Sequence, residues 1–564
     1  MMDDNDLLFV SAKSPFASLQ NTTILTPEEL EMRSCDDEPF IVSNVPTEHA
    51  YLVAPETNWL LASRENHAQC AKEIEILYQS RLLQAENLQA EKTCHVANSL
   101  FILGSGKSAE DFCLLANQNG FEAVLLAPSD VASIGGHLGA FIVHFANDSV
   151  RNYAQGVLFV DIPALQLYCG IESAGDFDDA HALLSALHAR LGEYVYHEIL
   201  HFDSTYCQYE NRREKCCAAC ADACPTFGIY ADDSSKQLHF SAIDCIKCGA
   251  CVALCPTGAI TFKESPTELF LRRVRLFADY QILLIDAPTL ASLPPQPPAL
   301  PPSVLPLVLP ELNALNPLLL LSCIQENGAS VALYKPNASP ALQSAIRITN
   351  AIVARGYHDS MGILLMQNLA DWEQLTSIAT IHDAKYLYTP RANEHVRKSF
   401  AERLRFVVKD RDLGVLPFEP TLRYGQVKLK DGCTLCLSCV GACNVGALIA
   451  NEQYFTLSFN PSLCTTCGYC ALSCPEDVIN IEESGIALNG QWFVPHVLAK
   501  DSPFCCVECG KPFATTRSVQ KVRDMLAANF AGDSHKLRSL ECCPDCKVKV
   551  MLNATTGEGH VERI

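Results

Sequence analysis

Three segments of the chain repeat one arrangement of cysteines, in which four thiols follow the spacing C-x2-C-x2-C-x3-C. They are CIKCGACVALCP at residues 245–256, CTLCLSCVGACN at 433–444 and CTTCGYCALSCP at 464–475. Three thiolates separated by two residues each can surround an iron–sulfur cubane from one loop, whereas the fourth thiolate must come from elsewhere. Zinc sites favour two separated C-x2-C pairs instead. The spacing therefore predicts that these segments bind 4Fe-4S clusters.

A fourth segment, CCAACADACP at residues 216–225, departs from this pattern. Cys217, Cys220 and Cys224 stand at the expected positions, but Glu214 replaces the first thiol. Two cysteines could supply the missing ligand, Cys207 from the preceding loop or the adjacent Cys216. With neither, the site would hold a three-iron cluster or none. We expect Cys207, because Cys216 would lie directly beside another ligand and would be hard to aim at the same cubane.

Short apolar runs suited to strands follow the motifs, at residues 258–262, 446–449 and 477–481. Together with the cysteine spacing, they make about residues 200–265 and 426–485 resemble the bacterial two-cluster ferredoxins. That resemblance implies two ferredoxin modules, in each of which the fourth cysteine of one motif ligates the cluster of the other. It implies these ligand sets: cluster one, Cys207, Cys217, Cys220 and Cys255; cluster two, Cys245, Cys248, Cys251 and Cys224; cluster three, Cys433, Cys436, Cys439 and Cys474; cluster four, Cys464, Cys467, Cys470 and Cys443. Asn444 replaces the proline that usually follows the fourth cysteine.

Two further cysteine pairs lie near the C-terminus. Cys506 and Cys509 form one C-x2-C pair, and Cys543 and Cys546 form the other. Separated pairs of this kind are typical of a structural zinc site, and we expect one here. The alternatives are a fifth iron–sulfur site that recruits the neighbouring Cys505 and Cys542, and a set of buried or reactive thiols.

The composition restricts the cellular setting. The chain of 564 residues contains 29 cysteines and has a formal net charge of −22. No signal peptide is visible in MMDDNDLLFV, and prolines and polar residues interrupt the longest apolar stretch, residues 305–323. We therefore expect a cytoplasmic protein without a membrane span, whose thiols bind metals. The negative charge argues against nucleic acid as a partner.

Residues 93–199 carry a pattern of glycines that could bind a dinucleotide. Gly104, Gly106 and Ala109 satisfy G-x-G-x-x-A after an apolar strand, whereas Phe101 stands where a phosphate-binding P-loop needs glycine. The acidic residue expected at the end of the second strand is missing, and about 100 residues are too few for a complete flavoprotein. We expect a degenerate, cofactor-free Rossmann-like region, and FAD or NAD binding is the alternative.

The remaining segments complete a multidomain chain of the α+β and α/β classes. We expect a poorly ordered extension over residues 1–60, a helix within 61–92, an α/β middle domain over 266–425, and the cysteine-pair region over 486–564. In the middle domain the sequence predicts strands at 281–285, 318–321, 330–334 and 362–365, helices at 340–355 and 391–404, and a proline-rich linker at 294–310 that forms neither.

The spacing of Cys207 from the Cys217 group, the second module and the C-terminal pairs together resemble the multi-cluster ferredoxin-like proteins associated with formate dehydrogenases in proteobacteria. The resemblance implies single-electron transfer to a redox protein partner beside a molybdenum or tungsten enzyme. Because no catalytic constellation stands out, we expect an electron carrier or accessory protein. An assembly or maturation factor for such an oxidoreductase is one alternative, and a flavin-containing oxidoreductase subunit is another.

Overall fold

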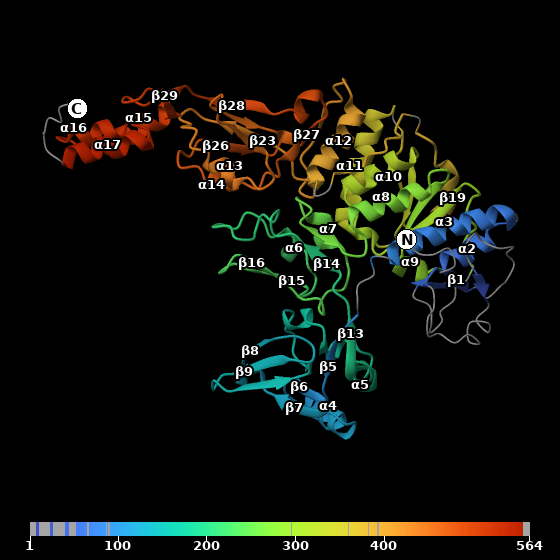
Figure 1. The fold of residues 1–564 in the computed structure, drawn as a ribbon. Coiled ribbons are helices and arrows are strands. Elements are labelled where there is room, and N and C mark those ends of the chain that lie inside the picture. The colour runs from blue at the N-terminus through green and yellow to red at the C-terminus, as the bar shows by residue number, and fades with distance from the viewer. Residues whose placement is uncertain are drawn as a thin grey trace. The chain divides into compact units, whose positions relative to one another are not determined.

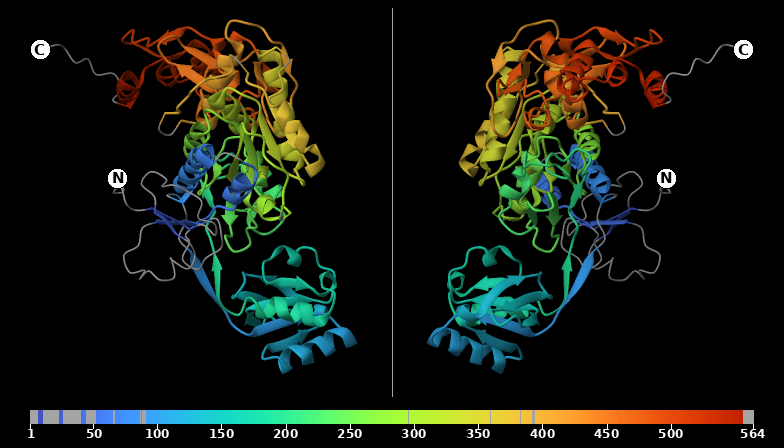
Figure 2. Two further views of the ribbon diagram at one scale, coloured as in Figure 1. Left: turned by 90° about the vertical axis from the view of Figure 1, so that its right-hand side faces the viewer. Right: turned by 90° about the vertical axis from the view of Figure 1, so that its left-hand side faces the viewer.

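The structure, a computed structural model, describes residues 7–10, 23–25, 40–43, 52–64, 67–85, 87, 91–294, 296–358, 360–381, 383–391 and 394–555. The chain forms two compact units, one of residues 1–204 and 209–390 and the other of residues 205–208 and 391–564. Figures 1 and 2 show both as ribbons in which helices and small sheets are mixed. Within the described ranges, no helix has the length and apolar character that a membrane span requires.

The first unit begins with a parallel sheet in the order β2-β1-β3-β4, followed by two helices. Most of the extension expected over residues 1–60 lies outside the described residues. A helix is found where the sequence predicts one within residues 61–92. The bounds are β1 (Leu7–Val10), β2 (Thr23–Leu25), β3 (Phe40–Ser43), β4 (Leu52–Val53), α2 (Glu56–Ala62) and α3 (His67–Ala85).

The Rossmann-like region contains a parallel sheet in the order β12-β11-β6-β7. Helix α4 follows β6, the strand of this sheet that comes first in the sequence. An antiparallel meander of β8, β9 and β10 is inserted before β11, and β13 pairs with β5. The bounds are β5 (Lys92–Val96), β6 (Ser99–Leu103), α4 (Lys107–Gln118), β7 (Glu122–Leu126), β8 (Val131–Gly135), β9 (Phe141–Phe145), β10 (Val150–Tyr153), β11 (Gln155–Leu158), β12 (Ile171–Ser173), α5 (Ala180–His188) and β13 (Gly192–Tyr196).

The segment with the first cysteine motifs follows a symmetric β-α-β-β-α-β order. Its outer strands, β14 and β17, pair antiparallel, and so do its inner strands, β15 and β16. Each short helix begins inside a cysteine motif, so the chain reverses direction around the thiols. The bounds are β14 (Leu200–Phe202), α6 (Ala219–Asp222), β15 (Ile229–Asp232), β16 (Gln237–Phe240), α7 (Ala250–Leu254) and β17 (Ile260–Phe262).

The middle segment of the first unit is a parallel sheet in the order β19-β18-β20-β21, with helices between its strands. Its apolar core contains residues of all four strands, among them Leu283, Val308, Ala332 and Met366. The bounds are α8 (Thr267–Leu276), β18 (Gln281–Asp286), α9 (Ala287–Ala291), β19 (Val304–Leu309), α10 (Pro317–Asn327), β20 (Val331–Tyr334), α11 (Pro340–Gly356) and β21 (Ile363–Met366).

Two sequence predictions for this segment are wrong. Residues 318–321 were expected as a strand but belong to α10, because the Asn316 side chain caps Leu319 and Pro317 occupies the first helical position. The proline-rich residues 294–310 were expected to form neither helix nor strand, yet β19 lies within them. Pro306 is tolerated there because, among the described strands, β19 lies at the edge of the sheet and pairs with β18 alone.

The second unit repeats the β-α-β-β-α-β order, with β23 paired to β26 and β24 to β25. A long helix, α12, precedes it, and β28 extends the inner pair to three strands. The bounds are α12 (Val396–Val408), β22 (Val415–Leu416), β23 (Gln426–Leu429), α13 (Ser438–Ala442), β24 (Leu448–Asn451), β25 (Thr456–Phe459), α14 (Tyr469–Leu472), β26 (Ile479–Glu482), β27 (Ile486–Ala487) and β28 (His496–Lys500).

The C-terminal part of this unit is a hairpin followed by helices. β29 (Pro503–Cys505) and β30 (Pro512–Thr515) are joined by the turn that carries the first C-x2-C pair. The helices are α15 (Thr516–Leu526), α16 (Ser534–Ser539) and α17 (Pro544–Thr555), and the second pair lies at the start of α17.

Candidate metal centres

The three regular cysteine motifs share one backbone conformation. In each, the residues two and four positions after the first cysteine have positive φ: Lys247 (58°) and Gly249 (77°), Leu435 (54°) and Leu437 (61°), and Thr466 (52°) and Gly468 (84°). Successive left-handed turns point backbone N–H groups to one side and form a cavity that suits an anion. The N–H of Thr466 lies 3.4 Å from the sulfur of Cys464, and the N–H groups of Lys247 and Leu435 bond their own first cysteines in the same way.

The first unit brings Cys224 to the thiols of the next motif. The pKa of the Cys251 thiol is raised to about 12, mainly by burial, and the neighbouring Cys245, Cys248 and Cys224 contribute to this rise. Cys245 likewise interacts with Cys224 and Cys248. These four residues are the set that the ferredoxin resemblance implies for cluster two.

In the second unit, each of the two cysteine motifs places its fourth thiol beside the thiols of the other motif. The pKa of Cys439 is raised to about 12, mainly by burial, and Cys433, Cys436 and Cys474 contribute to this rise. For Cys470, burial raises the pKa most, and Cys467, Cys464 and Cys443 contribute. The structure thus brings together the thiols predicted for cluster three and those predicted for cluster four.

These raised pKa values provide a test of whether iron–sulfur clusters fit. Buried thiolates without a counter-charge are unfavourable, and iron would supply that charge and deprotonate its ligands. A cubane is also larger than a single ion, so it holds its ligands farther apart than zinc does. The inward N–H groups can then donate to cluster and ligand sulfurs. Both the thiol groups and their surroundings fit a 4Fe-4S cluster.

The cysteines predicted for cluster one are divided between the two units. Cys217, Cys220 and Cys255 belong to the first unit, whereas Cys207 belongs to the short segment that packs in the second. Cys216 is half-buried beside Cys217. The choice between Cys207 and Cys216 as fourth ligand therefore stays a prediction.

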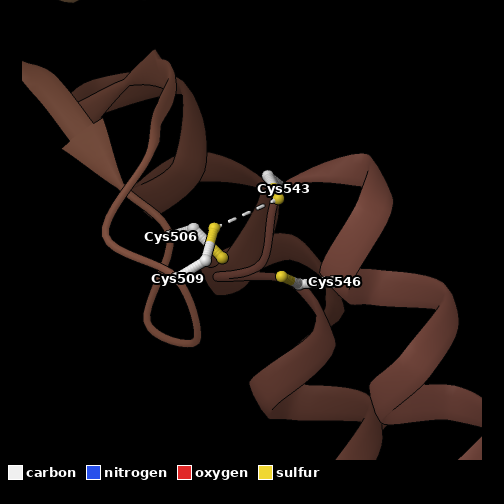
Figure 3. A group of neighbouring side chains, drawn as sticks. All are labelled: Cys506, Cys509, Cys543 and Cys546. Carbon is white, nitrogen blue, oxygen red and sulfur yellow. Dashed lines mark hydrogen bonds between the residues drawn. The ribbon is translucent and has the colours of Figure 1, made fainter.

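The C-terminal cysteine pairs meet at one point, where the side chains of Cys506, Cys509, Cys543 and Cys546 converge (Figure 3). Their sulfur atoms all lie within 4.8 Å of one another, and those of Cys509 and Cys543 are 3.7 Å apart. Tetrahedral Zn–S bonds of about 2.3 Å place ligand sulfurs roughly 3.8 Å apart, so the four thiols fit a single zinc ion.

The surroundings of Cys506 also favour a thiolate. Burial raises the pKa of this thiol, but the backbone N–H groups of Cys543, Cys509 and Glu508 outweigh that effect and lower it well below the usual range. The turn ends at Gly510, which has a φ of 74°. The neighbouring Cys505 is exposed and is not one of the four convergent residues.

The glycines of the Rossmann-like region lie where a dinucleotide fold would place them. Gly104 begins the turn after β6, and Gly106, with a φ of 91°, directly precedes α4. A Cβ on Gly104 would lie 2.7 Å from the Cβ of Phe159, so the chain that follows β11 packs tightly against this turn. The geometry explains the glycine and the buried Ala109 by close packing, and FAD or NAD binding stays an untested alternative.

Two arginines bind the loop of the third regular motif, a feature that the sequence analysis missed. Arg397 on α12 donates to the carbonyl oxygen of Cys464 at 2.5 Å, and Arg423 donates to that of Thr466 at 3.3 Å. Arg397 is 3% exposed and stacks 3.9 Å from the ring centroid of Tyr424. No local sequence signal could identify this contact, because Arg397 and Cys464 are 67 residues apart.

The loop of the second regular motif is open to solvent instead. Cys436 is exposed and lines a cavity of about 490 Å³. The other lining residues come from the motif itself, from the β24–β25 hairpin and from β30 and the start of α15. Thr515 Oγ1 donates to the carbonyl of Thr434 at 2.9 Å, so the C-terminal hairpin is anchored on this motif.

Two segments of the chain match known iron–sulfur families. The family of the 4Fe-4S dicluster domain matches residues 212–259, and the family of the 4Fe-4S binding domain matches residues 457–480. Both matches support an iron–sulfur, ferredoxin-like protein. Below, the segments 200–265 and 426–485, which the sequence predicts to be ferredoxin modules, are called module one and module two. The matched ranges include neither Cys207 nor residues 433–443. Among curated proteins, none matches the chain.

Proposed function

We propose that this ferredoxin-like protein carries four 4Fe-4S clusters and passes single electrons between redox partners. The observation that carries the proposal is the repeated loop geometry, in which three motifs share the same left-handed turns and each gathers a thiol from a neighbouring motif. Such clusters accept and donate one electron at a time without substrate chemistry of their own. The C-terminal cysteines, we propose, hold a structural zinc.

Electron exchange with a partner would take place at cluster three. Its ligand Cys436 is exposed and faces the cavity of about 490 Å³, whereas Cys464 and Cys439 are buried. A partner that reaches this cavity would approach a ligand sulfur without any rearrangement. The formal net charge of −22 favours a redox protein with a basic docking surface. By the sequence resemblance, a formate dehydrogenase is the partner to test first.

The decisive experiment is anaerobic quantification of iron, sulfide and zinc, combined with EPR of the reduced protein. About sixteen irons and one zinc per chain are expected. Roughly eight irons or fewer would overturn the four-cluster assignment. Reversible reduction, followed by electron transfer to a partner dehydrogenase, supports the carrier role. Transfer of intact clusters to an apoprotein, without electron transfer, would support an assembly factor instead.

A further inference from the structure

Arg397 is a buried cation in contact with the loop that is predicted to bind cluster four. One of its terminal nitrogens donates to the carbonyl of Cys464 at 2.5 Å, and the other donates to the carbonyl of Arg423 at 2.7 Å. The guanidinium is therefore fixed on both sides, and the Tyr424 ring covers its face. An arginine remains charged in proteins, so this site holds a permanent positive charge.

The charge of Arg397 acts directly on the predicted ligands. The thiolates of Cys464 and Cys467 both interact with it electrostatically. Because the guanidinium is 3% exposed and Cys464 is buried as well, water screens the interaction weakly. Adding an electron to a cluster makes it more negative, and a nearby fixed cation stabilises that reduced form.

We propose that Arg397 raises the reduction potential of cluster four. This inference rests on the proposed function, because it requires cluster four to be present. Exposed charges contribute less: Arg517 donates to the Cys433 carbonyl at 3.4 Å, but solvent surrounds and screens it.

The test is an EPR-monitored redox titration of the anaerobic full-length protein. A Cys470→Ser variant identifies the signal of cluster four, whose reduction potential the titration measures. Arg397→Gln should lower the reduction potential of cluster four. At a fixed solution potential, the ratio of reduced to oxidised cluster should then fall by a factor on the order of ten. Arg397→Lys should restore much of the lost potential.

Arg405→Gln is the matched control, because Arg405 lies on the same helix and donates to the carbonyl of Phe493 instead of a cysteine loop. It should leave the potential of cluster four unchanged. Arg397→Met is the second neutral variant, for use where Arg397→Gln fails to fold. If cluster four has the same potential in the neutral variant as in the unmodified protein, at full iron content, the proposal is overturned while the four-cluster function stands. Too little iron in the unmodified protein would instead contradict the proposed function.

Discussion

The side-chain amide of Asn444 donates to the backbone carbonyl of Cys207, at 3.0 Å and across 237 residues of sequence. The same amide donates to the carbonyl of Thr205 at 3.1 Å. Asn444 stands where two-cluster ferredoxins usually have proline, which carries no such donor. The departure from the family pattern therefore has a structural reason, since Asn444 holds residues 205–208 in the second unit. Gln208 adds a second anchor through its hydrogen bond to Thr465.

Asn444→Pro is expected to release this segment. Both hydrogen bonds of the amide are lost, and the one to Cys207 is partly buried, so we expect a loss of about 1–3 kcal/mol in the free energy of unfolding. Hydrogen–deuterium exchange of peptides that cover residues 205–208 should rise severalfold. Asn451→Ala, which removes an exposed hydrogen bond to the N–H of Tyr454, is the control and should leave these peptides unchanged. Unaltered exchange in Asn444→Pro would contradict the anchoring role.

The fourth ligand of cluster one can be identified by a pair of substitutions. Cys207→Ser should reduce the iron content by about four per chain, or by about one if a three-iron cluster remains, because a serine oxygen is a poor substitute for a thiolate. Cys216→Ser should retain all the iron. Anaerobic iron and sulfide analysis of both variants decides between the two cysteines. The reverse result would assign the ligand to Cys216.

Gly249 and Gly468 occupy equivalent left-handed positions but have different neighbours. A Cβ on Gly249 would lie 2.7 Å from the backbone nitrogen of Ala314, whereas a Cβ on Gly468 would meet no atom within 4 Å. Both alanine substitutions strain the backbone, since φ is 77° and 84°. Gly249→Ala alone adds a clash with rigid backbone, so it should lower iron content in module one more than Gly468→Ala does in module two. Equal losses would show that the contact with Ala314 is unimportant.

We expect the zinc content of the C-terminal site to depend on Cys509 and not on Cys505. Cys509→Ser should abolish stoichiometric zinc, because it leaves three thiolates in a site that needs four. Cys505→Ser should retain zinc, because Cys505 is exposed and lies outside the convergent set. Elemental analysis of the purified variants measures the difference. Iron in place of zinc would indicate the fifth iron–sulfur site considered as an alternative.

The cysteine motifs could be predicted from sequence because their geometry is local. Left-handed turns and inward thiols depend on a few consecutive residues, and the strands at 260–262, 448–451 and 479–482 follow the apolar runs closely. Residues 318–321 were misassigned because a short apolar run is compatible with either a strand or a buried helix. The Asn-Pro pair in front of them was a helix signal that could have corrected the error.

The contacts between the cysteine motifs and residues distant in sequence could not be predicted in this way. Arg397 and Asn444 reach partners that are 67 and 237 residues distant, and neither residue belongs to a recognisable pattern. The strand at Val304–Leu309 was missed for a related reason. Whether a proline is tolerated depends on its strand lying at the edge of the sheet, and strand order is a property of the assembled fold.

The last prediction concerns Lys335, which lies after β20 and binds two carboxylates from neighbouring strand ends. Its Nζ is 2.5 Å from Asp286 and 2.9 Å from Glu311. Burial raises the pKa of Glu311; for Asp286 burial acts in the same direction, but hydrogen bonds from Lys335 and Thr289 lower the pKa overall. Lys335→Met leaves the buried Asp286 and the half-buried Glu311 without their cation. The variant should lose about 3–5 kcal/mol in the free energy of unfolding at pH 7.

The sign of the pH dependence follows from these shifts. The lowered pKa of Asp286 stabilises the native protein above the unfolded value of about 3.9, and this contribution is lost as the pH falls through the folded pKa. In Lys335→Met both carboxyl groups take up protons more readily, because burial and mutual repulsion are no longer opposed. The stability difference between the unmodified protein and Lys335→Met should therefore be largest near pH 7 and shrink towards about pH 4.

Denaturant unfolding at several pH values measures this difference. Lys92→Met, which removes an exposed ion pair to Glu198, is the control, and its stability should change little. A difference that stays constant with pH would mean that Lys335 stabilises the fold by packing and not by its charge.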